Sequence, residues 1–137
     1  MRSRILVDSR QRQSGTTGSF VIGLKPTFEN IHTVRLLYAD LPNPATGPSG
    51  PYFAVRINEL GSSTRLAGTN GRETTFLIPV NANVSERCFY YSNTAFEQLM
   101  SFSPGLSLGS LSIEITRNFG ASQISDESII LLEVEHD

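Results

Sequence analysis

Short segments that alternate apolar with polar residues recur along the whole chain, and residues typical of turns separate them. Alternation with a period of two indicates a β-strand that buries one face and exposes the other. It is clear, for example, in Phe20, Ile22 and Leu24. We therefore expect eight strands, over 3–8, 19–24, 32–41, 52–60, 73–80, 86–91, 108–117 and 128–135.

Two further segments modify this pattern. Asn70-Gly71 is a strong tight-turn signal, which predicts a local hairpin between 64–67 and 72–80 and raises the strand count to nine. The segment 94–101 carries apolar residues at i, i+3 and i+4, a spacing that predicts one short helix. The chain is thus expected to be almost entirely β.

The proline-rich stretch 42–51 is the one place where the chain could divide into two domains. A division there would leave a first piece of about 41 residues, which is too small to hold a hydrophobic core of its own. Pro42 also has no backbone N–H to donate to a sheet, so it ends the strand before it. We therefore predict a surface loop inside a single domain that covers residues 1–137.

Charge is distributed unevenly between the two ends of the chain, although the net charge is only -2. The first twelve residues hold four arginines and one acid, and the last twelve hold five acids and no lysine or arginine. A jelly roll places its first and last strands side by side, so Arg2 and Arg4 are expected to face Glu133 and Glu135. An up-and-down barrel would do the same, and unrelated charged ends are the other interpretation.

Connections of unequal length favour the jelly roll over the up-and-down barrel, because a barrel of that kind has a regular hairpin rhythm. Longer links at 42–51, 61–72 and 92–107 break that rhythm. The predicted fold class is all-β, a single jelly-roll sandwich of about eight antiparallel strands in two sheets.

Signatures of catalysis or cofactor binding are missing from the sequence, which contains no nucleophile elbow, phosphate loop, paired cysteines or zinc-protease motif. His32 and His136 are the only histidines, and the single Cys88 precedes aromatic residues in an apolar strand. We predict a protein that is not an enzyme and that has no metal or cofactor. The small negative charge also argues against specific nucleic-acid binding.

Three adjacent aromatic residues, Phe89, Tyr90 and Tyr91, cannot all point into the core, because neighbouring residues of a strand point to opposite faces. An exposed tyrosine is typical of an interface. The alternative is an aromatic ring that lies over its own sheet. The sequence leaves both interpretations open.

Five stretches of the chain, in order, resemble small single jelly-roll virion proteins of tailless icosahedral viruses and of large DNA viruses with a double jelly-roll main capsid protein. They are ILVDSRQR, SFVIGL, IHTVRLLYADLPNP, LSIEITRNFG and IILLEVE. The positions that carry the resemblance are Asp8, Ser9, Arg10 and Arg12, then Leu41, Pro42 and Asn43, and then Leu111, Ile113, Glu114, Ile115 and Gly120.

The resemblance implies a structural virion protein, with a penton protein that forms homopentameric five-fold capsid vertices as the leading expectation. It implies neighbouring major capsid proteins and a spike protein as partners, and the virion capsid, assembled in host cytoplasm, as the location. The cluster of arginines near the N-terminus adds contact with an internal membrane surface as a hypothesis. The alternatives are a minor or cement capsid protein and a spike-type sugar- or receptor-binding β-sandwich. Candidate subunit or capsid contacts are Arg2, Arg4, Arg10, Arg12, Pro44, Pro48 and Pro51.

Overall fold

The computed structural model describes residues 1–43, 51–68, 71–83, 85–93, 95, 97–117, 119, 124 and 126–137. This part of the chain contains ten β-strands and two short 3₁₀ turns, and no α-helix. The strands are β1 (Arg2–Asp8), β2 (Ser14–Gly15), β3 (Ser19–Pro42), β4 (Tyr52–Ile57), β5 (Thr64–Arg65), β6 (Glu73–Thr74), β7 (Phe76–Pro79), β8 (Arg87–Tyr91), β9 (Leu99–Arg117) and β10 (Ile129–His136). The 3₁₀ turns are η1 (Ser9–Gln11) and η2 (Asn58–Leu60).

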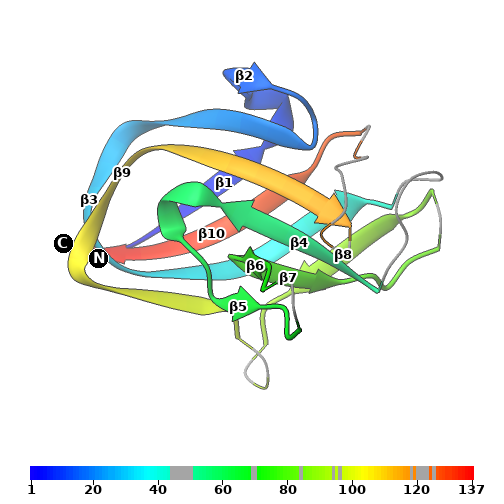
Figure 1. Ribbon diagram of the computed structural model, residues 1–137. Helices are drawn as coiled ribbons and strands as arrows, with labels where there is room; N and C mark the ends of the chain where they lie inside the picture. Colours follow the sequence, from blue (N-terminus) through cyan, green and yellow to red (C-terminus); the bar gives the residue numbers. More distant parts are fainter. Residues whose placement is uncertain are drawn as a thin grey trace.

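Eight of the strands belong to one antiparallel sheet, in which the hydrogen-bonded order is β1-β10-β3-β9-β4-β7 (Figure 1). Strands β2 and β8 pair with β3 outside this path, and β5 and β6 form a separate two-stranded hairpin. The fold is therefore all-β and antiparallel, as the alternating sequence pattern predicts.

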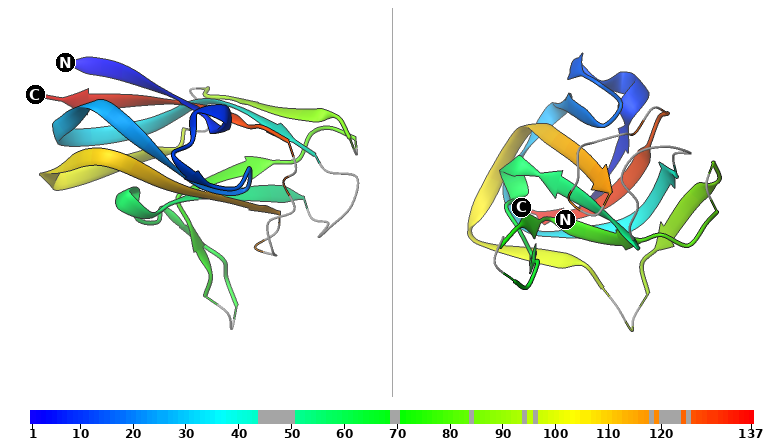
Figure 2. Two further views of the ribbon diagram at one scale, coloured as in Figure 1. Left: turned by 90° about the horizontal axis from the view of Figure 1, so that it is seen from above. Right: turned by 45° about the vertical axis from the view of Figure 1, so that its right-hand side comes forward.

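The long strands β3 and β9 give this sheet its curled shape, because they run together around a bend (Figures 1 and 2). The first part of β3, 19–23, pairs with 110–114 of β9, and its last part, 31–42, pairs with β10 and β8. Shifts in register between Gly23 and Thr33 mark the bend. The two predicted strands 19–24 and 32–41 are thus the two halves of one bent strand.

The helix predicted over 94–101 is wrong for residues 99–101. In the structure these residues belong to β9, which begins at Leu99. Residues 99–101 pair with 33–35 of β3. Leu99 is exposed and Met100 packs against the core, which is the alternation of a strand. A segment this short would form few hydrogen bonds in a single turn of helix, whereas β3 supplies a row of backbone hydrogen-bond partners.

The predicted hairpin before Phe76 is confirmed, since Thr64 lies opposite Thr74 and Arg65 opposite Glu73. Two predicted strands are subdivided in the structure. The segment 52–60 ends as a strand at Ile57 and continues as η2, and 73–80 consists of β6 and β7.

Apolar side chains from both halves of the curled sheet form one core. Its largest fully buried members include Phe53 of β4, Phe76 of β7 and Leu132 of β10. Since these strands come from opposite ends of the strand order, the curl is what allows their side chains to share a single interior.

The first and last strands are neighbours, as the charge distribution predicts. Arg2 lies opposite Glu135 and Arg4 opposite Glu133. The Nε of Arg2 is 3.8 Å from a carboxylate oxygen of Glu135. Glu133 instead forms its ion pair with Arg35 of β3, at 3.9 Å.

Candidate functional site

Arg10 and Arg12, two of the predicted contact residues, bind acids of their own chain around η1. Arg10 Nη2 lies 2.7 Å from Asp8, and Arg12 Nη1 lies 3.1 Å from Glu127. The bond from Arg10 lowers the pKa of the Asp8 carboxyl. A hydrogen bond from the Ser9 hydroxyl, reinforced by Arg12, lowers the pKa of Glu127. These two arginines therefore stabilise the turn after β1.

The predicted proline contacts lie in the loop between β3 and β4. Pro42 is the last residue of β3, and Pro51 is exposed, with its carbonyl accepting a hydrogen bond from the Val80 N–H at 2.8 Å. Pro44 and Pro48 lie outside the described residues.

An apolar band crosses the outer face of the half-sheet made by β1, β10, β3 and β8. Its central row follows the strand register, from Leu6 to Leu131, Tyr38 and Tyr91. Phe89, two residues before Tyr91, extends it on β8. Leu6 is 61% exposed, Tyr91 64% and Phe89 40%. These five residues are named the apolar band below.

The aromatic rings of the apolar band are clustered. Tyr38 and Tyr91 have ring centroids 5.2 Å apart, and Tyr38 and Phe89 6.4 Å apart. Tyr90 is buried, so Phe89 and Tyr91 are the two members of the aromatic run that leave the core. Partial exposure of Tyr38 beside two exposed rings makes a surface on which another protein can bury apolar area.

Charged residues border the apolar band on both sides along the strands. On one side, Arg35 lies within ion-pair distance of Glu97 and Glu133. On the other side, Arg87 Nε lies 2.7 Å from Asp40. An apolar centre between polar margins is the arrangement found in many protein–protein interfaces.

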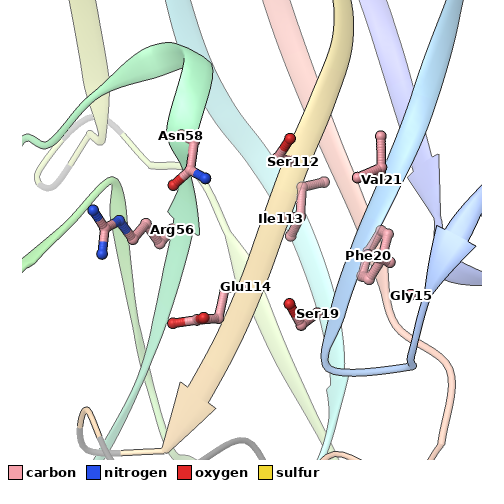
Figure 3. Close-up of a pocket in the computed structure, with 9 residues that line it drawn as sticks. All are labelled: Gly15, Ser19, Phe20, Val21, Arg56, Asn58, Ser112, Ile113 and Glu114. Carbon is pink, nitrogen blue, oxygen red and sulfur yellow. The ribbon is translucent and has the colours of Figure 1, made fainter.

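A polar hollow of about 400 Å³ lies on the outer face of the other half-sheet, between β2 and β3 on one side and β4 on the other (Figure 3). Its lining residues are Gly15, Ser19, Phe20, Val21, Arg56, Asn58, Ser112, Ile113 and Glu114. Phe20 and Ile113 are buried beneath it, so the exposed lining is mainly hydroxyl, amide and charged groups. Arg56 also lines a second hollow of about 280 Å³, together with Arg72 and Phe119.

Arg56 and Glu114 lie opposite each other on β4 and β9, but they form no ion pair among the described residues. Glu59 of η2 is engaged instead with the sheet, because its carboxylate accepts hydrogen bonds from the Ser112 N–H at 2.6 Å and the Ser112 hydroxyl at 2.9 Å. The hollow can therefore form polar contacts through Arg56 and Glu114, while Glu59 bonds to β9 just beyond the point where its pairing with β4 ends.

The two histidines and the single cysteine lie in separate environments. His32 is bonded to Asp137 at 3.0 Å, and His136 to the Ser3 hydroxyl at 2.9 Å. Cys88 is fully buried. Within the described residues, no three His, Cys, Asp or Glu side chains are grouped to hold a metal ion.

The fold and its surfaces define an all-β protein with one core, an apolar band on one face and a polar hollow on another. No protein-family model matches the chain, and no curated protein matches it. Within the described part, no helix has the length and apolar composition needed to cross a membrane.

Leu6, Leu131 and Tyr38 are surface residues that the sequence pattern did not predict. A signal for them exists in the runs ILV, IILL and LLY, where consecutive apolar residues must occupy both faces of a strand. Which of the two faces meets the core depends on the pairing, so the sequence alone could not select the exposed members.

Proposed function

We propose that this chain is a structural virion protein with a single jelly-roll fold, and that it forms homopentameric five-fold vertices of a capsid. The observation that carries the proposal is the order in which its strands pair. In a jelly roll with strands numbered 1 to 8 along the chain, one sheet has the order 1-8-3-6 and the other 2-7-4-5. This order is specific, because most ways of pairing eight strands do not produce it.

The chain offers eight segments that correspond to these positions. In chain order they are β1, 19–24 and 31–42 of β3, β4, β7, β8, 108–117 of β9, and β10. Strand β10 lies between β1 and 31–42, which also pairs with β8, giving the order 1-8-3-6. The second half of β9 lies between 19–24 and β4, which also pairs with β7, giving the order 2-7-4-5.

The apolar band supports a role in assembly rather than catalysis. Contiguous exposed apolar side chains mark surfaces that another molecule covers. A ring of five needs two different patches that meet around a closed rotation, and the apolar band serves as one of them. Neighbouring major capsid proteins and a spike protein are the further partners of a vertex, and its place is the virion.

Among the predicted contact residues, Arg4 is the best candidate for a contact with another molecule. It is exposed and forms no ion pair among the described residues, whereas Arg2, Arg10 and Arg12 each have an acidic partner in the chain. Pro51 remains a candidate from the loop that borders β4.

The native mass of the purified chain, measured by light scattering or native mass spectrometry, tests the ring. We expect particles built from rings of about 75 kDa, five times the 15.0 kDa chain, so that the measured mass is a whole multiple of the ring mass. Tyr91→Thr should reduce the pentamer, and Glu29→Gln, an exposed position of β3 outside both the apolar band and the polar hollow, should leave it intact. A chain that stays monomeric at high concentration, alone and with its capsid neighbours, contradicts the proposal.

A sugar- or receptor-binding β-sandwich is the second candidate, because the exposed rings of Tyr38, Phe89 and Tyr91 also suit stacking against a sugar. A glycan array separates the two functions. Binding that is lost in Tyr91→Thr, by a chain that stays monomeric, supports the sugar-binding function instead of the vertex.

A further inference from the structure

Strand β1 lies at the margin of the curled sheet and has a paired neighbour, β10, on one side only (Figures 1 and 2). Its hydrogen bonds with β10 are fixed at both ends. The Met1 amine donates to the His136 carbonyl at 2.8 Å, and the His136 N–H donates to the Met1 carbonyl at 2.9 Å. At the other end, the Ser9 N–H donates to the Ser128 carbonyl at 3.0 Å.

The bonds at Met1 and Ser9 determine which backbone groups of β1 point away from β10. In an antiparallel pair, hydrogen-bonded residues alternate with residues that are not bonded to the partner. Residues 1, 3, 5, 7 and 9 therefore bond to β10. The N–H and C=O groups of Arg2, Arg4, Leu6 and Asp8 point to the free edge.

Two other marginal strands, β7 and β8, are capped by side chains on their free edges. Gln98 bonds to both the N–H and the C=O of Leu77 in β7, and the Asn81 amide donates to the Phe89 carbonyl in β8 at 2.9 Å. Proteins commonly protect an edge with such caps, with proline or with a bulge. The described residues provide no such cap for β1, which contains no proline and pairs with β10 without a shift in register.

We propose that the free edge of β1 pairs with β1 of a second copy of this chain, antiparallel and about a two-fold axis at Leu6. Leu6 then lies opposite Leu6 of the second copy, and Arg4 opposite Asp8. The backbone groups of all three residues are those that point to the edge, so each opposed pair can exchange two hydrogen bonds. The sheet continues across the contact, and the apolar bands of the two copies join.

The side chains favour this register over the adjacent ones that the backbone allows. An axis at Arg4 would place two arginines opposite each other, which is unfavourable. An axis at Ile5 would place Leu6 opposite Arg4, and an axis at Val7 would place Leu6 opposite Asp8, so either would set the apolar side chain against a charge. With the axis at Leu6, the exposed leucine is covered by an identical leucine, and Arg4 lies opposite Asp8, whose carboxylate also binds Arg10 of its own chain.

This contact goes beyond the proposed vertex and does not depend on it. A two-fold contact brings the same patch of both copies together, whereas a ring of five joins two different patches. The edge of β1 pairs copies whether or not the ring forms, so particles contain two copies, or ten where rings also form.

The test is the particle mass of the full chain as a function of concentration, by sedimentation equilibrium, for the parent and three variants. Leu6→Pro removes the edge N–H but no bond to β10, because proline is tolerated where its missing N–H would face outward. It should halve the particle mass. Leu6→Thr keeps the N–H and loses only apolar area, so it should weaken the association without abolishing it.

Leu131→Thr is the matched control, because it lies in the same row of the apolar band but on β10, away from the edge. It should leave the pairs of copies intact, even where the altered apolar band weakens the ring of five and reduces a particle of ten copies to two. Circular dichroism and thermal unfolding show whether Leu6→Pro remains folded. If it does not, Arg4→Glu replaces it, since a second acid opposite Asp8 should raise the dissociation constant severalfold.

Three outcomes overturn the edge contact. The first is a parent chain that is monomeric at all concentrations. The second is a ring of five whose mass does not change in Leu6→Pro or Arg4→Glu, and this outcome leaves the vertex proposal standing. In the third, Leu131→Thr separates the pairs of copies, as Leu6→Pro does, which means that the face of the apolar band, and not the edge, holds the copies together.

Discussion

The side-chain amide of Gln98 pairs with the backbone of Leu77 as a neighbouring strand would. Its Oε1 accepts the Leu77 N–H at 2.6 Å, and its Nε2 donates to the Leu77 carbonyl at 2.7 Å. The backbone carbonyl of Gln98 accepts the Leu36 N–H at 3.0 Å. One residue thus connects β7, at one end of the strand order, with β3 in the other half of the sheet.

Replacement of Gln98 by leucine should lower the free energy of unfolding by about 1–3 kcal/mol, because it leaves both polar groups of Leu77 without a partner at a largely buried position. Gln98 is only 8% exposed, so water cannot fully replace the amide. Urea unfolding followed by circular dichroism measures the change. Glu97→Gln, at a half-exposed neighbouring position, is the control, and equal effects of the two substitutions would contradict the capping role.

Asn43, at the start of the proline loop, should contribute to stability in a similar way. It is 3% exposed, and its side chain donates to the Ala82 carbonyl at 3.1 Å and accepts a bond from Arg117. Asn43→Ala should lower the free energy of unfolding by about 1–3 kcal/mol. Asn83→Ala removes an exposed side-chain bond to Glu86 and should cost much less, so a smaller loss for Asn43→Ala than for this control would refute the prediction.

Two phenylalanines on neighbouring segments of the chain should differ sharply in their contribution to stability. Phe76 is fully buried and Phe89 is 40% exposed. Phe76→Ala should cost about 3–5 kcal/mol, from lost apolar burial and the cavity left behind. Phe89→Ala should cost less than about 1 kcal/mol in the monomer, since surface substitutions have small effects. The two thermal unfolding midpoints, measured at a concentration where the chain is monomeric, give the comparison.

Glu127 should make the stability depend on pH in the acidic range. The Ser9 hydroxyl and Arg12 lower its pKa in the folded state, so the unfolded chain takes up the proton first as the pH falls. Its contribution is complete above about pH 4.3, the ordinary value for Glu, and is lost as the pH falls through the lower folded pKa. Unfolding in urea between pH 6 and pH 2.5 measures this loss.

Glu127→Gln cannot titrate, so the difference in stability between the parent and this variant should shrink as the pH falls below about 4.3. Asp8, whose pKa Arg10 lowers, is present in both proteins, so its contribution to the pH dependence of stability cancels in the difference. A difference that stays constant across the range would mean that Glu127 is not held as a carboxylate by Ser9 and Arg12.

Most strand positions were predictable because alternation reports directly on which residues of a strand can be buried. The segments 3–8, 86–91 and 128–135 match β1, β8 and β10 to within about one residue at each end. The adjacency of β1 and β10 was also predictable, because opposite charges had accumulated at the two ends of the chain.

The predictions failed where the secondary structure of a segment depended on a strand that is distant in the sequence. The segment 94–101 has helical spacing, yet residues 99–101 form a strand because the backbone of 33–35 lies beside them. The gap predicted between 24 and 32 is a bend, because β9 follows β3 around it. Short segments carry too little local preference to resist such partners.

The sequence by itself determined that this chain is all-β and that each strand has one mainly apolar face. It also determined that the two ends of the chain carry opposite charges, which favours pairing of the first strand with the last. Only the tertiary structure decided which apolar residues remain outside, because Leu6 and Leu131 are as apolar as Ile5 and Leu132. The direction of a side chain follows from the pairing of its strand, and a shift of one residue would exchange the two sets. The apolar band and the free edge of β1 therefore exist only in the folded chain.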